Sequence, residues 1–196
     1  MNQDGGKWVL LSVSTSKDAS LRVFAWRRLR KLGAVYFHQS VCLLPDLPRV
    51  REALAPVTAR IRGQGGRVRT LTITVPADEH DALVAEQRDD RNEEYAEVVE
   101  RVPQFLEEIV METARGRATY AEVEESGADL ERFAKWLASI ADRDYFQAGR
   151  GADARAAVQQ CREALAAFEG AALAADTVAD NSSESVVQLR VVEDQL

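Results

Sequence analysis

The spacing of apolar and polar residues changes along this chain, and each spacing predicts a different element. Residues 8–13 form an unbroken apolar run, which is typical of a strand covered on both faces. Residues 68–75 alternate between apolar and polar side chains, as in a half-buried strand. The whole pattern predicts strands over 8–13, 35–38, 41–44 and 68–75, and helices over 19–32 and 48–62. This order, strand-helix-strand-strand-helix-strand, predicts a ferredoxin-like domain over residues 7–76.

Capping and helix-breaking residues support these boundaries. Ser16 or Asp18 is placed to cap the first helix, and Gly33 follows its last turn. Pro48 suits the first turn of the second helix, where a backbone amide has no partner within the helix. Pro56 lies inside that helix and is expected to kink or divide it.

After residue 76 the chain becomes rich in Glu, Ala, Arg and Leu, which favour helices. We expect a helical subdomain over 77–174, with helices over 78–115, 120–142 and 153–172 and an interruption near Pro103. Segment 175–196 begins with a polar linker, and it is expected to be either a flexible tail or an edge strand over 186–192. The expected class is therefore α+β, a ferredoxin-like domain followed by a helical subdomain.

The composition narrows the class of protein. The 196 residues include only two cysteines, Cys42 and Cys161, and two histidines, His38 and His80, which argues against a disulfide framework and a structural zinc site. Their spacing suggests no nucleophile with a base, so we expect no enzyme activity, metal or cofactor. No stretch is long and apolar enough to span a membrane, and the first residues do not resemble a signal peptide. A cytoplasmic protein is expected.

The net charge of −7 conceals two oppositely charged parts. Residues 1–75 hold 13 Lys and Arg but four acidic residues, a net charge of +9. The remainder holds 12 basic and 28 acidic residues, a net charge of −16. One interpretation is an anion-binding face, with nucleic acid among its ligands. The other is that the two parts attract and partly cover each other.

The first helix concentrates positive charge on one side. At about 100° per residue, Leu21, Ala25 and Leu29 face the core. The candidate nucleic-acid-binding residues opposite are Arg22, Trp26, Arg27, Arg28, Arg30 and Lys31. The cations would contact phosphates while the indole stacks on a base. The alternative, which we prefer for Trp26, is that it packs beneath the acidic helices while the arginines pair with carboxylates.

A second candidate site would bind a small oxyanion such as chromate or sulfate. Ser14, Thr15, Ser16 and Lys17 offer hydroxyls, an ammonium and the free amides of a helix N-terminus. Residues of these types are also ordinary caps, and a carboxylate at Asp18 would repel an anion. Arg143 could reach a ligand pocket, but a structural salt bridge is the interpretation that we prefer.

Several segments resemble the N-terminal domain of ChrB-type chromate resistance proteins. They are Trp8–Leu11, Leu21–Ala34, Val41–Pro45, Arg91–Glu97, Leu130–Phe146 and Gln160–Phe168. The resemblance implies a cytoplasmic, chromate-responsive regulator of an efflux gene, with an N-terminal fold similar to that of PaaX-type repressors and Cas2-type proteins. Longer members of the family carry a further C-terminal domain, whose function is not transferred. Cas2-type nucleases place an acidic metal ligand after the first strand, and residues 12–17 contain none, which argues against a metal-dependent nuclease.

Together these observations predict a non-enzymatic DNA-binding or accessory transcriptional regulator that responds to chromate. The alternatives are an oxyanion-binding protein or enzyme with a pocket between the sheet and the helices, and an interaction module whose acidic helices bind a basic partner. Either the helical subdomain or the partner in a homodimer could supply cover for the strand over 8–13. Exposure of the basic side chains of the first helix is the observation that separates these hypotheses.

Overall fold

The computed structural model describes residues 6–15, 18–115 and 119–193, with side chains described as far as residue 177. The chain divides into two compact units. The first comprises Met1–Glu93 with Ile140–Gly149, and the second comprises Glu94–Ser139 with Arg150–Leu196. Four strands and two helices lie in the first unit and long helices in the second, so the predicted α+β class is confirmed.

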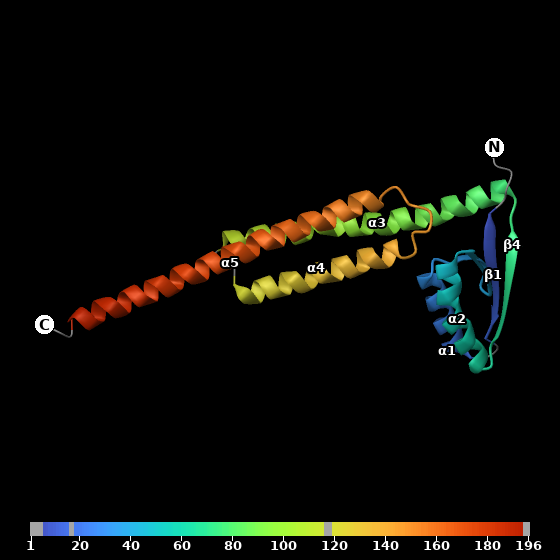
Figure 1. The fold of residues 1–196 in the computed structure, drawn as a ribbon, viewed down its shortest axis with the longest axis horizontal. Helices are drawn as coiled ribbons and strands as arrows, with labels where there is room; N and C mark the ends of the chain where they lie inside the picture. Colours follow the sequence, from blue (N-terminus) through green and yellow to red (C-terminus); the bar gives the residue numbers. More distant parts are fainter. Residues whose placement is uncertain (1–5, 16–17, 116–118, 194–196) are drawn as a thin grey trace. The chain divides into compact units, whose positions relative to one another are not determined.

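The first unit is built on a four-stranded antiparallel sheet. Its elements are β1 (Lys7–Ser14), α1 (Ala19–Lys31), β2 (Val35–His38), β3 (Val41–Pro45), α2 (Pro48–Gly63) and β4 (Arg67–Thr74). This is the predicted order of elements. The strands are arranged β2-β3-β1-β4, with β1 between β3 and β4. Figure 1 shows α1 and α2 together on one face of this sheet.

Both faces of β1 are covered over much of its length, as its unbroken apolar run predicts. Val9 and Leu11 are fully buried beneath α1 and α2 in a core that includes Leu29 and Ile61. On the other face, Trp8 is fully buried with Leu43, and this cluster includes Leu83 from the helix that follows β4. Cover on both faces explains why residues 8–11 carry no polar side chain.

The first unit extends beyond the boundary predicted at residue 76. The start of α3 (Ala77–Ala114) and residues 140–149 belong to it. Gln87 Nε2 donates a hydrogen bond to the Gly33 carbonyl at 2.6 Å, and the Tyr145 hydroxyl donates to the Leu32 carbonyl at 2.9 Å. These two bonds satisfy the backbone carbonyls of Leu32 and Gly33, which follow the last residue of α1. At this point Gly33 turns the chain with a φ of 74°.

The second unit is helical. It contains the remainder of α3, most of α4 (Tyr120–Ala141) and all of α5 (Gly151–Glu193), which Figure 1 shows side by side. Phe105, Cys161 and Phe168 lie in its core, and Phe133 of α4 meets Phe105 edge to face. Within the described residues, no helix combines the length and apolar character needed to cross a bilayer.

The structure differs from the expected helix boundaries in several places. Helix α2 is not divided at Pro56, one of the two expected effects of that residue, and α3 continues through Pro103, where an interruption was expected. Residues 175–193 continue helix α5, so the alternative of an edge strand over 186–192 is wrong. Alanine-rich sequence before residue 175 provides a helix onto which the polar segment is added at little cost, because propagation adds a hydrogen bond for each residue fixed.

Candidate nucleic-acid interface on helix α1

Helix α1 begins at a side-chain cap. Asp18 Oδ1 accepts hydrogen bonds from the Ser20 and Leu21 backbone amides at 2.9 and 3.0 Å, and from the Ser20 hydroxyl at 2.7 Å. Of the two predicted caps, Asp18 is observed in this role, and Ser16 lies outside the described residues. The Ser20 hydroxyl contributes most to lowering the pKa of the Asp18 carboxyl below its usual value of 3.8, and the amides add to this effect.

Replacing Asp18 with alanine is expected to lower the thermal midpoint at pH 7, because two amides of the first turn lose their acceptor. Since the folded-state pKa is depressed, the carboxylate stabilises the fold above pH 3.8, and this contribution is lost as the pH falls through the folded-state pKa. The difference in midpoint between wild type and Asp18→Ala should therefore shrink in acid. Asp18→Asn is the control: it keeps a cap that does not titrate, so the difference in midpoint between Asp18→Asn and Asp18→Ala should not depend on pH in this range. A constant difference between wild type and Asp18→Ala from pH 7 to pH 3 would contradict the assignment.

The two sides of α1 are as the helical periodicity predicts. Leu21, Ala25 and Leu29 are buried in the core of the first unit. The six predicted nucleic-acid-binding side chains, here called the α1 cationic surface, are all exposed: Arg22, Trp26, Arg27, Arg28, Arg30 and Lys31. Trp26 is 49% exposed, so the preferred expectation that it is buried is wrong.

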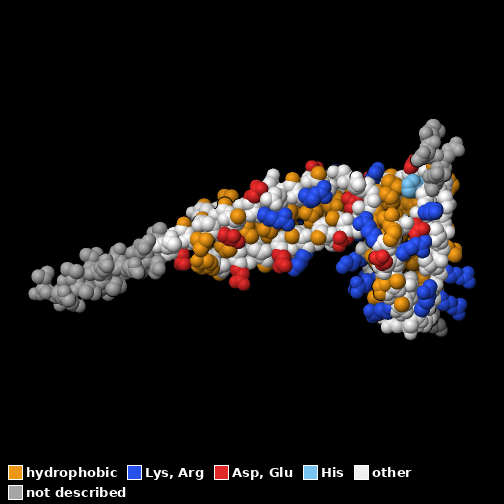
Figure 2. Space-filling view, viewed as in Figure 1, with side chains coloured by type: hydrophobic (Ala, Val, Ile, Leu, Met, Phe, Trp, Pro, Cys, Tyr) orange, Lys and Arg blue, Asp and Glu red, His pale blue; other side chains and the backbone are white. Residues whose placement is uncertain are grey.

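Four cations of this surface have no carboxylate partner among the described residues. Helix α1 contains no acidic residue, and in the described part of the chain no ion pair holds Arg27, Arg28, Arg30 or Lys31. Arg30 instead lies 5.8 Å from the centre of the Trp26 ring. Figure 2 shows Lys and Arg side chains around the sheet-bearing unit, with acidic ones sparse among them. The alternative in which the arginines pair with carboxylates therefore has no support for these four residues.

Helix α2 adds a contact that sequence analysis missed. The Arg60 guanidinium lies 4.0 Å from the centre of the Phe24 ring, and Arg28 lies 5.8 Å from the same ring. Cation–π attraction holds both guanidinium groups near one aromatic side chain without removing their charge. No pattern within α1 indicates Arg60, because the contact depends on how α1 and α2 pack.

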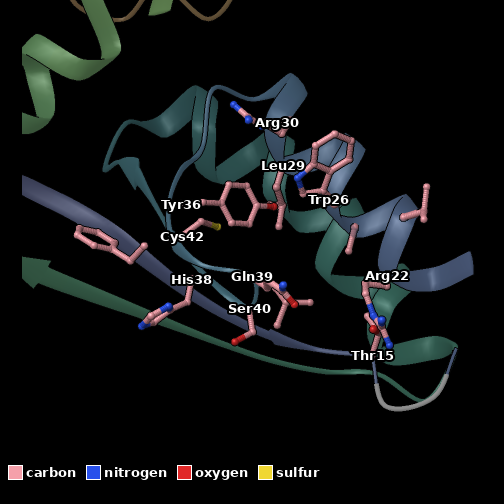
Figure 3. Close-up of a pocket in the computed structure, with 14 residues that line it drawn as sticks. Thr15, Arg22, Trp26, Leu29, Arg30, Tyr36, His38, Gln39, Ser40 and Cys42 are labelled. Carbon is pink, nitrogen blue, oxygen red and sulfur yellow. The ribbon is translucent and has the colours of Figure 1, made fainter. Parts of the chain in front are cut away.

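A cavity of about 430 Å³, here called the α1 cavity, lies between α1 and the hairpin of β2 and β3. Arg22, Trp26 and Arg30 line its helical side, since residues four apart share a helix face. Tyr36, His38, Gln39 and Ser40 of the hairpin also line the cavity, and Figure 3 shows the Tyr36 and Gln39 side chains extending towards α1. The Val13 amide donates to the Ser40 carbonyl at 2.7 Å, which holds the hairpin turn against the end of β1.

Two titratable side chains that line the α1 cavity are protonated at neutral pH. Cys42 lines the cavity but is only 1% exposed, and burial raises the pKa of its thiol to about 12, so it is not a thiolate at neutral pH. Burial also raises the pKa of Tyr36 above its usual value, so its phenol stays protonated. His80 is engaged elsewhere, accepting a hydrogen bond from Trp8 Nε1 at 3.1 Å. The described residues contain no group of three or more His, Cys, Asp and Glu able to hold a metal ion.

Of the residues predicted to bind an oxyanion, Arg143 lies apart from Ser14 and Thr15. Thr15 is buried beside the α1 cavity and Ser14 is exposed at the end of β1, while Ser16 and Lys17 lie outside the described residues. Arg143 lies beside Gly33, after the last turn of α1, whereas Thr15 precedes its first turn. A helix of 13 residues is about 20 Å long, so these two residues are at opposite ends of it. The Asp18 carboxylate already occupies two of the amides that the hypothesis assigned to an anion.

The first unit is thus an α+β unit whose helix α1 carries, among the described residues, four exposed cations outside any ion pair beside a half-exposed tryptophan, and it is a candidate polyanion-binding module. Residues 22–178 match the family described as "Protein ChrB, N-terminal". The chain is also 30% identical over 129 residues to Protein ChrB of Cupriavidus metallidurans. That alignment covers 65% of this chain and 36% of the relative, so this chain matches about a third of the relative's length. No solved structure matches the chain.

The chain therefore belongs to the ChrB family, within its N-terminal domain, and the resemblance to ChrB-type chromate resistance proteins is confirmed.

Proposed function

We propose that this chain is a non-enzymatic, cytoplasmic DNA-binding regulator of the ChrB family and that the α1 cationic surface is its DNA interface. The exposure of this surface, with Arg27, Arg28, Arg30 and Lys31 outside any ion pair of the described residues, is the observation that carries the proposal. Cations that are not neutralised within the protein are free to replace the counterions of a polyanion, and release of those ions favours binding.

The architecture supports the same proposal. The element order β-α-β-β-α-β and the strand order β2-β3-β1-β4 favour a ferredoxin-like fold. In this arrangement both helices pack on one face of the sheet, so the outer side of α1 is left to solvent along its length. A rigid helix anchored by Leu21, Ala25 and Leu29 keeps its cations in a fixed array.

The alternative of an oxyanion-binding protein or enzyme has less support. The residues predicted for an anion site are divided between the two ends of α1, and the buried Cys42 thiol is not poised for redox chemistry. An interaction module that uses its acidic helices leaves the exposed cations of α1 without a role.

Binding to duplex DNA should depend steeply on salt. The α1 cationic surface supplies five charges, so the logarithm of the binding constant should fall with the logarithm of salt concentration with a slope of about −4 to −5. Fluorescence anisotropy with labelled duplex from the region upstream of the chain's own gene measures this slope. The affinity should fall by about 10²–10³-fold between about 50 and 200 mM salt. Absence of binding at the lower salt concentration would overturn the proposal.

A further inference from the structure

We propose that the α1 cavity receives an unstacked base of single-stranded nucleic acid, while neighbouring phosphates lie on Arg27 and Lys31. This inference rests on the proposed function, because it names the form of nucleic acid that the same surface prefers. It is carried by the position of Trp26, which lines the cavity and is also 49% exposed between the cations of α1.

Two adjacent rows of side chains on α1 place the α1 cavity, which would receive the base, next to exposed cations that would contact phosphates. Arg22, Trp26 and Arg30 form the row that lines the cavity. Arg27 and Lys31 form the next row, outside the cavity and exposed. Residues four apart are about 6 Å apart along a helix, a spacing that suits successive phosphates of an extended strand. A strand that follows Arg27 and Lys31 therefore has its base beside Trp26.

The size and lining of the cavity fit a flat polar ring. A volume of about 430 Å³ lies within the usual range for small-molecule sites, so a base can enter with part of its sugar. Trp26 offers an aromatic surface for stacking, which every base can use. Gln39 and Ser40 of the hairpin turn and the Tyr36 phenol offer hydrogen-bonding groups to the edge of the base.

Single-stranded nucleic acid fits these features better than duplex or a small molecule. In a duplex the base must first unstack and separate from its pairing partner. A single strand has no base pair to break, so its base enters the cavity at a lower cost in free energy. A free aromatic anion could enter the cavity, but it would leave the exposed row of Arg27 and Lys31 unused. The continuation of positive charge beyond the cavity is what favours a polymer.

The test compares three labelled oligonucleotides of about 12 nucleotides at about 50 mM salt: single-stranded dT, the same backbone with abasic sites, and a duplex of equal length. Wild-type protein should bind the dT strand at least about 5-fold more tightly than the abasic strand, as expected for one stacked base. Ser40→Phe places a bulky ring at the mouth of the cavity without altering a cation. It should abolish this difference between the dT and abasic strands.

The matched control is Thr70→Phe, which adds the same ring at an exposed position of β4, the opposite edge strand of the sheet. It should behave as wild type. A measurement that needs no variant is the fluorescence of a 2-aminopurine base in the strand, which should be quenched when wild-type protein binds and recover when unlabelled dT is added.

The outcomes separate the two proposals. Equal affinity of wild type for the dT and abasic strands, a base preference that survives in Ser40→Phe, or unquenched 2-aminopurine would overturn the base-binding proposal while DNA binding stands. The same holds if free dTMP raises the thermal midpoint of wild type but not of Ser40→Phe while the strands show no base preference, since the cavity then serves a small ligand. Failure of all three oligonucleotides to bind would overturn the proposed function itself.

Discussion

Replacement of Arg27, Arg28, Arg30 and Lys31 by alanine in one variant is expected to weaken duplex DNA binding about 10³-fold at about 0.1 M salt. Each cation that contacts a phosphate contributes about 0.9 to the salt slope, so the four substitutions should make the slope less steep by about 3 to 4. The loss should be similar for different DNA sequences, because contacts to phosphates do not read bases. Anisotropy titrations at several salt concentrations measure both quantities.

The chain offers a control with the same change in net charge. Arg115, Arg132, Lys135 and Arg162 are exposed in the helical unit, where each has a polar partner in Glu112, Asp129, Glu131 and Gln159 respectively. Their replacement by alanine should change DNA affinity by less than about 10-fold, through the long-range field alone. Equal losses in the two variants would show that net charge, and not the α1 cationic surface, drives binding.

The variant should remain folded. All four replaced side chains of α1 are exposed, and alanine has the highest helix propensity of any residue. Circular dichroism at 222 nm of wild type, variant and control tests this directly. A variant that retains its helical signal and loses DNA affinity isolates the role of the four cations.

Trp8→Ala is expected to destabilise the first unit by about 3–5 kcal/mol, which is a large share of the total stability of a typical domain. Trp8 has no exposed surface and packs with Leu43 and Leu83, with Phe146 at 5.8 Å between ring centres. Its Nε1 also donates to His80 Nδ1. Truncation removes a large apolar contact area and opens a cavity in the cluster of Leu43, Leu83 and Phe146. It also leaves the His80 acceptor without its donor.

Trp26→Ala is the matched control, because it makes the same chemical change at a side chain that is 49% exposed. It should lower the free energy of unfolding by about 1 kcal/mol or less, because it is a surface substitution that removes one exposed cation–π contact, that with Arg30. Urea unfolding followed by circular dichroism and by tryptophan fluorescence measures both variants. Trp8→Phe should fall between them, since it keeps a ring and removes the donor. Similar losses for Trp8→Ala and Trp26→Ala would contradict the burial on which both assignments rest.

Much of the candidate interface could be predicted without the structure. The helical spacing of Leu21, Ala25 and Leu29 places the remaining side chains of α1 on the outer face, and all six predicted residues are exposed there. The preferred expectation of a buried Trp26 follows from the general tendency of large aromatic side chains to be buried, and that tendency does not hold at this position. Periodicity indicates which side of a helix is apolar, but it does not show what lies against the other side.

The α1 cavity could not be predicted in this way. Gln39 and Ser40 are recognisable as a turn, but their place opposite Trp26 depends on β2 forming the edge of the sheet beside α1. The same is true of Arg60, which meets Phe24 only because α1 and α2 pack together. Contacts of this kind join residues whose local patterns are independent of one another.

The sequence by itself determined the order of strands and helices through residue 74, the apolar side of α1, the segregation of charge and the resemblance to the ChrB family. Each of these features depends on residues that are close in the sequence. Residues three to four apart lie on the same face of a helix, so their spacing alone predicts which face is apolar. Tertiary structure alone decided that residues 77–93 and 140–149 belong to the same compact unit as the sheet, that a cavity opens beside Trp26, and that the Tyr145 hydroxyl donates to the Leu32 carbonyl. That last bond spans 113 positions, and over such separations only the packing of whole elements selects which groups meet.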